Sequence, residues 1–280
     1  MKRTWMNLAV VAAALGAGAV AVFAQWPDFP TSGPRTPEGK IDFKGPAPRT
    51  ATGKPDFSGL WEPAAGSFNG THPLPFAIPT APDDPPVAQF FNIGGGFKEG
   101  LPFQPWAAEL RAQRKGSGAK DNPDAHCLPM GLTQLHMHIQ PRKVVQTPRE
   151  IIVLYEANGN TRQILTDGRS LPKNDPTPWW YGYSVGRWEE DALVVETRGF
   201  RDDVWLDVEG SPMTSAGKMT ERWRRPYFGL MQVDITIDDP KAYTKPFTVR
   251  VNHRLMPDTE MMEFVCEERD AIHYVGGKGK

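Results

Sequence analysis

The second half of the chain is a series of short runs rich in β-branched and aromatic residues, and this series limits the possible folds more than any other feature. Turn sequences such as Asn158-Gly159 and Asp167-Gly168 separate the runs. Strands spaced this closely predict a mainly β fold, either an antiparallel β-barrel or a β-sandwich. The expected strands are Met137–Ile139, Lys143–Gln146, Glu150–Glu156, Thr161–Thr166, Trp180–Trp188, Ala192–Thr197, Lys218–Arg225, Leu230–Ile237, Phe247–Arg254 and Met261–Glu267.

Long irregular segments precede these strands. Pro (28) and Gly (27) make up about a fifth of the 280 residues, against about 12% in average proteins. Residues 25–55 lack apolar periodicity and are expected to form an extended or disordered arm, followed by one all-β domain over 56–280. Good helix formers after a proline predict one short helix at Pro105–Gln113.

The arm contains a short internal duplication, in which Pro34–Gly45 returns as Pro48–Gly59. Only the second copy continues into Leu60 and Trp61, so we expect that copy to enter the fold and the first to dock nowhere. The Gly59-Leu60-Trp61 step is similar to the Gly-x-Trp opening of lipocalin-like barrels. That resemblance implies a barrel that is closed at one end by the tryptophan.

The N-terminus has the pattern of a secretory signal peptide over residues 1–24. Lys2 and Arg3 precede the apolar run Leu8–Val22, and a small-residue cleavage site lies before Gln25. The alternative is an uncleaved anchor. We expect a periplasmic or secreted protein with no membrane association after cleavage.

Two cysteines, Cys127 and Cys266, would meet an oxidising compartment. They are candidates for one disulfide. Two separate buried thiols remain the alternative, because sequence does not place their Cα atoms.

Net charge and the absence of known motifs restrict the classes of binding partner that we expect. The formal net charge of −1 gives no basic surface for nucleic acid or anionic membrane. The sequence has no phosphate loop, dinucleotide fingerprint or nucleophile elbow, so no cofactor is expected. A small molecule is the expected partner, and the oligomeric state stays open.

The run Pro178–Trp188, with its return run Ala192–Thr197, predicts a β-hairpin rich in aromatic residues. Small residues at Gly182, Ser184 and Gly186 leave a groove on one face, where either a ligand or a neighbouring segment could lie. An aromatic lining suits apolar or aromatic ligands and sugars. The candidate ligand-binding residues are Trp180, Tyr183, Arg187, Trp188, Trp205 and Arg222.

Acid/base chemistry would need titratable groups that face the same cavity. Arg169 or Arg187, if buried and paired with Glu196 or Glu221, would form a structural ion pair instead of a catalytic site. His136 and His138, two residues apart on one expected strand face, are further candidates as general bases or metal ligands. The full set of catalytic candidates is His136, His138, Glu156, Asp167, Arg169, Glu196 and Glu221.

Several short motifs, taken as a series from about residue 53 to 270, resemble a large group of exported bacterial proteins, most of them uncharacterised. These are PDFSGLW, DGR, GYSVGRW, LVVET, ERWRR and EFVCEE. The resemblance implies an exported β fold and brings no established activity. In that group we expect Glu-Gly-Asp at the hairpin turn, whereas this chain has Glu190 in place of the glycine. The sequence therefore does not settle whether the turn is tight.

These features predict an exported, lipocalin-like barrel that binds a small apolar or aromatic ligand of the terpenoid, steroid, aromatic or sugar class. One alternative is a cofactor-independent lyase, isomerase or hydrolase that uses a His/carboxylate/Arg set in the same cavity. Another is a structural or partner-binding protein.

Overall fold

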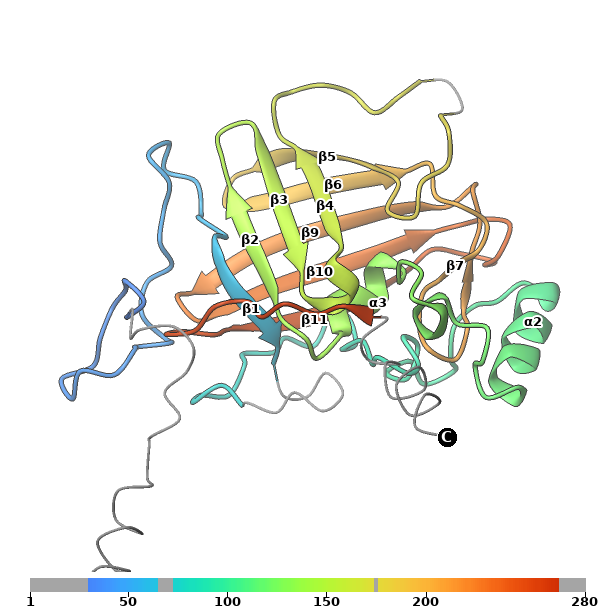
Figure 1. Ribbon diagram of the computed structural model, residues 1–280, viewed down its shortest axis with the longest axis horizontal. Helices are drawn as coiled ribbons and strands as arrows, with labels where there is room; N and C mark the ends of the chain where they lie inside the picture. Colours follow the sequence, from blue (N-terminus) through green and yellow to red (C-terminus); the bar gives the residue numbers. More distant parts are fainter. Residues whose placement is uncertain (1–29, 65–72, 174–175, 267–280) are drawn as a thin grey trace, which may run out of the picture. The chain divides into compact units, whose positions relative to one another are not determined.

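Nine strands close into a barrel in the part of the chain that the computed structural model describes, residues 30–64, 73–173 and 176–266 (Figure 1). The order around the barrel is β1-β11-β10-β9-β6-β5-β4-β3-β2. The mainly β fold class is confirmed, and the barrel is the form it takes. The strands are Gly59–Pro63 (β1), Arg142–Gln146 (β2), Glu150–Tyr155 (β3), Thr161–Leu165 (β4), Tyr183–Glu189 (β5), Ala192–Arg198 (β6), Lys218–Tyr227 (β9), Leu230–Asp238 (β10) and Phe247–Leu255 (β11).

The barrel belongs to a compact unit that comprises Ser32–Lys280. A separate unit comprises Met1–Thr31, of which only Pro30 and Thr31 are described. The predicted signal peptide therefore lies outside the described residues. In the described part of the chain, no helix has the length and apolar character that a membrane span requires.

Two predicted strands are wrong. Met137 ends a short helix, and Ile139 is 54% exposed. An apolar run this short does not distinguish helix from strand. The run Met261–Glu267 forms no strand in its described part, 261–266. In the closed barrel β1 and β2 already pair with each other, so no barrel edge is left for a further strand.

An odd number of strands has a topological consequence. Antiparallel neighbours alternate in direction, so nine strands close only if one pair is parallel. That pair is β4 and β5, whose ladder has two residue pairs, Ile164–Ser184 and Leu165–Val185. Parallel neighbours need a long connection, here residues 166–182. We call the boundary between β4 and β5, with this connection, the seam.

The duplicated arm is ordered in its described part, unlike the expectation. Each copy folds the same tight loop, bridged at Arg35–Ile41 in the first and at Arg49–Pro55 in the second. The first copy also docks, because the amides of Phe228 and Gly229 donate to its carbonyls at 2.8 and 2.9 Å. The prediction that it docks nowhere is wrong.

The second copy of the duplication and the Trp61 that follows it pack against one end of the barrel. Phe57 is fully buried, and its ring stacks on Trp188 with centroids 5.8 Å apart. The indole of Trp61 donates to the Phe57 carbonyl at 3.0 Å. The Arg225 guanidinium lies 4.7 Å from the centre of the Trp61 ring and donates to the Phe228 carbonyl at 2.7 Å. We call these residues the closed end.

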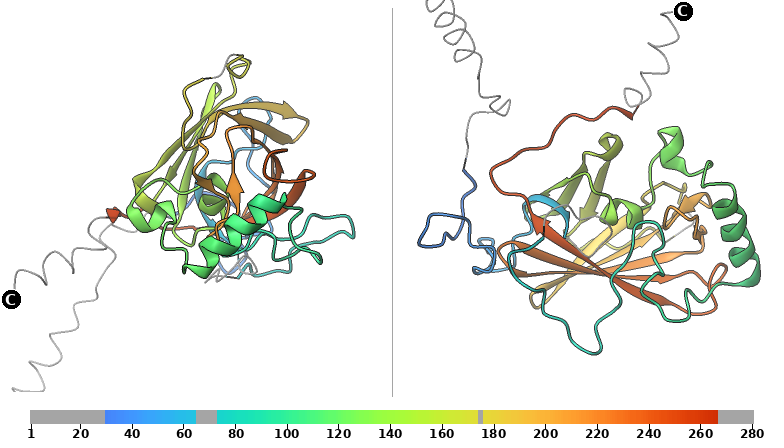
Figure 2. Two further views of the ribbon diagram at one scale, coloured as in Figure 1. Left: turned by 90° about the vertical axis from the view of Figure 1, so that its right-hand side faces the viewer. Right: turned by 90° about the horizontal axis from the view of Figure 1, so that it is seen from below.

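Helices and a small hairpin surround the barrel. The predicted helix is confirmed as α2, Pro105–Gly116, which lies outside the barrel beside the hairpin Val204–Trp205 (β7) and Pro212–Met213 (β8) (Figures 1 and 2). The sequence did not predict this hairpin or the helix Leu132–Met137 (α3). Short 3-10 turns occupy Pro123–His126 and Ala157–Gly159.

The two cysteines form a disulfide. The Cα atoms of Cys127 and Cys266 are 5.6 Å apart. This settles the open alternative between one bridge and two thiols.

Candidate functional site

The interior of the barrel holds a buried ion pair between Arg162 on β4 and Glu221 on β9. Their side chains are 1% and 0% exposed. Arg162 Nη1 donates to Glu221 Oε1 at 3.0 Å, and Nη2 makes a second bond to the other carboxylate oxygen. Arg162 Nη2 also donates to Ser184 Oγ and Thr197 Oγ1, both at 3.1 Å. Such a pair is stable in an apolar interior only because its remaining hydrogen-bonding groups are satisfied.

Two histidines extend this network. His136 Nε2 lies 2.7 Å from Glu221 Oε1, and His136 Nδ1 lies 3.4 Å from His253 Nε2. On the far side, Arg142 Nη1 lies 3.2 Å from His253 Nδ1. An arginine only donates, so His253 Nδ1 accepts and its Nε2 carries the proton. Each imidazole then donates through Nε2. The hydrogen bonds therefore run in one direction, from Arg142 to His253, from His253 to His136, and from His136 to Glu221.

The pKa values agree with neutral histidines. Burial lowers the pKa of His136 and takes that of His253 well below its usual range. Burial alone would raise the pKa of Glu221, but the Arg162 charge and hydrogen bonds from His136 and Arg162 hold it at about 2. Burial lowers the pKa of Arg142 to about 10, so this guanidinium stays charged at neutral pH.

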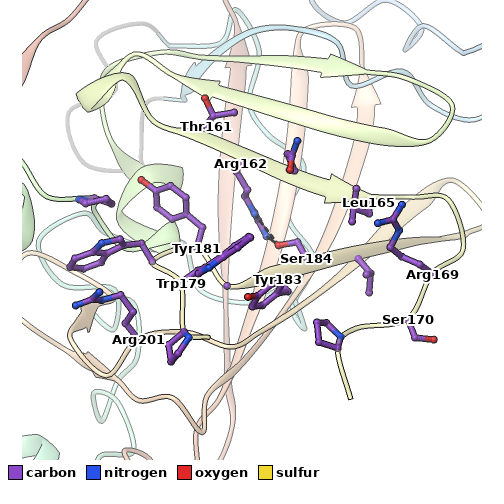
Figure 3. A pocket seen from close by; sticks show the side chains of 17 residues that line it. Thr161, Arg162, Leu165, Arg169, Ser170, Trp179, Tyr181, Tyr183, Ser184 and Arg201 are labelled. Carbon is purple, nitrogen blue, oxygen red and sulfur yellow. Dashed lines mark hydrogen bonds between the residues drawn. The ribbon is translucent and has the colours of Figure 1, made fainter. Parts of the chain in front are cut away.

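A cavity of about 700 Å³ lies at the seam, beside the buried network (Figure 3). Arg162 and Ser184 belong both to the network and to the wall of this cavity. Figure 3 shows Arg162 extending from β4 toward Ser184 on β5, with aromatic side chains of the 166–182 connection nearby. The aromatic lining residues are Trp179, Trp180, Tyr181 and Tyr183.

The backbone at Gly182 makes this wall. Its φ of +58° is in the left-handed region, and a Cβ there would lie 2.5 Å from the Arg198 carbonyl oxygen. The expected strand Trp180–Trp188 therefore begins three residues later, at Tyr183. Trp180 and Tyr181 leave the strand and line the cavity instead.

Two tyrosine hydroxyls near the cavity have no acceptor for their protons among the described residues. They belong to Tyr181, a lining residue, and to Tyr155 on β3, which is 2% exposed. The centres of the two rings are 6.5 Å apart. Buried hydroxyls are rarely left unpaired, so these groups need a physical explanation.

The structure brings some of the predicted residues to this region. His136 and Glu221 meet in the network. Trp180, Tyr183 and Arg169 line the cavity.

Other catalytic candidates lie elsewhere. His138 follows α3, and its ring accepts a hydrogen bond from the Gln140 amide at 3.2 Å, so the two histidines share no strand face. Glu156 is buried and accepts the Met262 amide. Asp167 pairs with Arg169 at a turn, and the Arg169 hydrogen bond holds the pKa of Asp167 at about 2. In the described residues no three His, Cys, Asp or Glu side chains converge as a metal site.

The remaining ligand-binding candidates serve other contacts. Arg187 pairs with Glu196 at 2.6 Å as an exposed ion pair outside the barrel wall. Arg222 pairs with Glu189 at 2.6 Å. Trp205 lines a separate cavity of about 540 Å³ near α2. Trp188 belongs to the closed end.

The predicted groove over Gly186 is filled. Side chains of Leu193, Thr166 and Ile164 come within 3.1–3.3 Å of where a Cβ would lie. At this glycine, the neighbouring segments occupy the groove.

Sequence reasoning missed Arg162, His253 and the two unpaired tyrosines. Strand alternation carried a signal for the first two. Arg162 shares a face with Ile164, and His253 shares one with Val251, so each is a polar residue at an inward position. For the unpaired tyrosine hydroxyls the sequence holds no such signal.

No protein-family model matches the chain, and neither a curated protein nor a solved structure matches it.

Proposed function

We propose that this chain is an exported β-barrel protein, related to the bacterial group that its motifs resemble, and that it binds a small aromatic or apolar molecule in the seam cavity. The observation that carries this proposal is the cavity of about 700 Å³ with four aromatic side chains in its wall. Small-molecule sites have this size and this mix of apolar surface with a few polar groups. The disulfide fits an oxidising compartment.

The seam is a better site than the barrel axis. The middle of the barrel is filled by buried side chains such as Trp223, Met231 and Val251. The parallel pair leaves the first residues of β4 without a β5 partner, and the cavity occupies that space. Access to Arg162 and Ser184 therefore runs through the wall of the barrel.

An enzyme would need a general acid or base that touches the substrate. His136 and Glu221 form the convergent pair that this alternative requires, yet neither lines the seam cavity, and both are at most 1% exposed. The hydrogen bonds that Glu221 accepts from His136 and Arg162 connect β9 to α3 and to β4 inside the barrel. Binding accounts for the cavity without chemistry from this pair.

Tryptophan fluorescence tests the proposal. The protein would be titrated with naphthalene, a monoterpene alcohol, a steroid and a disaccharide. We expect quenching or a spectral shift with at least one, and an affinity about twofold to tenfold weaker in Trp179→Ala, because a stacked aromatic pair is worth about 0.5–1.5 kcal/mol.

Trp106→Phe is the matched control. Trp106 is also a half-exposed tryptophan, at 44%, and its indole donates to the Lys241 carbonyl away from the cavity. Its replacement should leave the affinity unchanged. No response with any compound, or equal losses in both variants, would contradict the proposed site.

A further inference from the structure

Hydrogen-bond donors without an acceptor lie in and behind the inner wall of the seam cavity in the described residues. Arg162 and Tyr181 are in its wall, and Tyr155 lies behind Tyr181 with its ring 6.5 Å away. The Tyr155 hydroxyl lies beside Arg162, which can only donate to it, so in the described residues neither phenol proton has an acceptor. In the same part of the chain, the Nε of Arg142, the cross-strand neighbour of Tyr155, is also buried without an acceptor.

One buried cation near this cavity, Arg142, has no carboxylate bonded to it in the described residues. The charged residues among the described lining are Arg162, Arg169 and Arg201, and each is paired with a carboxylate, Glu221, Asp167 and Asp203 respectively. Behind it, Arg142 and Arg162 are fully buried cations, and Glu221 is the carboxylate bound to Arg162. Arg142 bonds to the carbonyls of His136 and His138 and to His253, which are neutral groups. The buried Glu62 carboxylate acts on Arg142 through space, and a negative charge on this side of the cavity would add to it in offsetting the Arg142 charge.

Two aromatic rings form the outer wall of the cavity. The rings of Trp179 and Tyr183 stack with centroids 4.4 Å apart and planes 23° apart. The Tyr183 hydroxyl is already used, because it donates to the Thr177 carbonyl at 3.0 Å. This wall offers aromatic surface, while the free donors lie deeper.

We propose that the seam cavity binds an aromatic carboxylate, with its ring on the Trp179–Tyr183 wall and its acidic oxygens toward Tyr181 and Tyr155. This inference rests on the proposed function and names its ligand class. The two hydroxyls donate to the carboxylate, and the charge of Arg142, the cross-strand neighbour of Tyr155, supports it from behind.

The cost of the unpaired hydroxyls supports this assignment. A buried donor without a partner destabilises the folded protein, whereas phenylalanine of the same shape does not. Tyrosine at both positions therefore has a use when a ligand supplies the acceptor. Carboxylates accept stronger hydrogen bonds than neutral oxygens do, which suits two phenols beside an arginine.

The test compares four probes of one shape: 2-naphthoate, 2-acetylnaphthalene, naphthalene and 2-naphthylmethylammonium. We expect 2-naphthoate to bind about tenfold or more tightly than naphthalene, since a hydrogen bond to a charged group exceeds a neutral one. Tyr181→Phe and Tyr155→Phe should each weaken 2-naphthoate binding about fivefold to tenfold and leave naphthalene binding unchanged.

Tyr243→Phe is the matched control, because it removes a buried hydroxyl that lies outside the cavity lining and already donates to the Pro212 carbonyl. It should change the preference for 2-naphthoate by less than about twofold. The melting temperature of each ligand-free variant provides a second readout. Tyr181→Phe and Tyr155→Phe should melt at or above the temperature of the parent protein, because each loses an unpaired donor.

The outcomes separate the two proposals. If naphthalene binds at the Trp179 wall and 2-naphthoate binds no more tightly, the carboxylate inference is wrong and the proposed function stands. Tighter binding of the ketone or the ammonium compound also overturns the inference. If none of the four probes binds, both proposals fail.

Discussion

The closed end and the seam use the same kinds of residue for different purposes. At the closed end, Phe57 is fully buried and Arg225 covers Trp61 while donating to backbone carbonyls. At the seam, Trp179 is 54% exposed, and Arg201 covers Trp180 at 4.6 Å. Aromatic rings and arginines therefore do not identify a site by themselves.

The hydrogen bonds distinguish the two regions. The Trp61 indole and the Arg225 guanidinium both have carbonyl partners. The Tyr181 hydroxyl has none in the described residues. A region whose donors are satisfied within the chain holds the fold together, whereas a region with unused donors beside a cavity has capacity for a ligand.

The strongest test of this contrast measures both stability and ligand affinity in one variant from each region. Phe57→Ala should lower the free energy of unfolding by about 3–5 kcal/mol, because it leaves a cavity in a packed end of the barrel. Trp179→Ala should change it by less than about 0.5–1 kcal/mol, since the side chain is largely in solvent. Urea denaturation monitored by circular dichroism measures both.

Affinity should show the opposite order. Under conditions where Phe57→Ala is folded, its affinity for the best seam ligand should equal that of the parent protein. A large loss of stability in Trp179→Ala, or a loss of affinity in Phe57→Ala, would show that the two regions are not separate in function.

Acidification should weaken the protein through the network beside the seam. His136 and His253 have lowered pKa values in the folded state, so the unfolded chain takes up protons that the folded chain does not. Their stabilising effect is complete above about pH 6.5 and is lost as the pH falls. We expect the free energy of unfolding to drop by about 2–4 kcal/mol between pH 7 and pH 5.

Glu221 has the same sign in a lower window. Its folded pKa of about 2 lies below the ordinary value of 4.5, so its contribution is present above about pH 4.5 and is lost toward pH 2. Denaturant titrations at each pH measure these slopes. His253→Gln should remove about half of the slope between pH 7 and pH 5.

His126→Gln is the control for the acid effect, because His126 is an exposed residue whose ring contacts the Lys120 carbonyl. It should leave the slope unchanged. Equal loss of slope in His126→Gln and His253→Gln would contradict the assignment of the acid effect to the buried network.

Local sequence pattern was sufficient for most of the barrel. Alternation along Leu230–Asp238 and Phe247–Leu255 placed Val233 and Val251 inside, and both are fully buried. The pattern did not reveal the parallel pair, because strand order depends on which edges meet when the barrel closes. Without that pair, the seam and its cavity could not be foreseen.

Only part of the site was predicted, because local pattern does not show which strands are neighbours in the barrel. The hairpin supplied Trp180 and Tyr183, and the list of acids supplied Glu221. Arg162 and Tyr155 come from strands that are neighbours of the cavity only through the barrel order. The duplication shows a related limit of local sequence. Its two copies have the same local fold but dock on different parts of the barrel.

A residue with a left-handed backbone lies in the β5–β6 turn, two residues after Trp188 of the closed end. The β5–β6 turn is tight, with Glu189 opposite Ala192, and Glu190 takes a left-handed φ of 54°. A non-glycine residue there costs about 1–2 kcal/mol. Lys54 donates to the Glu190 carbonyl at 3.0 Å, which attaches the turn to the second copy of the duplication.

Glu190→Gly should raise the free energy of unfolding by about 0.5–1 kcal/mol, which is the relieved strain less about 0.5–1 kcal/mol for the added freedom of glycine in the unfolded chain. Glu190→Ala keeps the strain and should give no gain, which separates the backbone effect from loss of the exposed carboxylate. Denaturant midpoints measure both. Because the turn adjoins the closed end, ligand affinity at the seam should stay the same in both variants. A change in affinity would mean that strain at the hairpin turn is transmitted along β5 to Ser184, and the two regions would then be coupled through that strand.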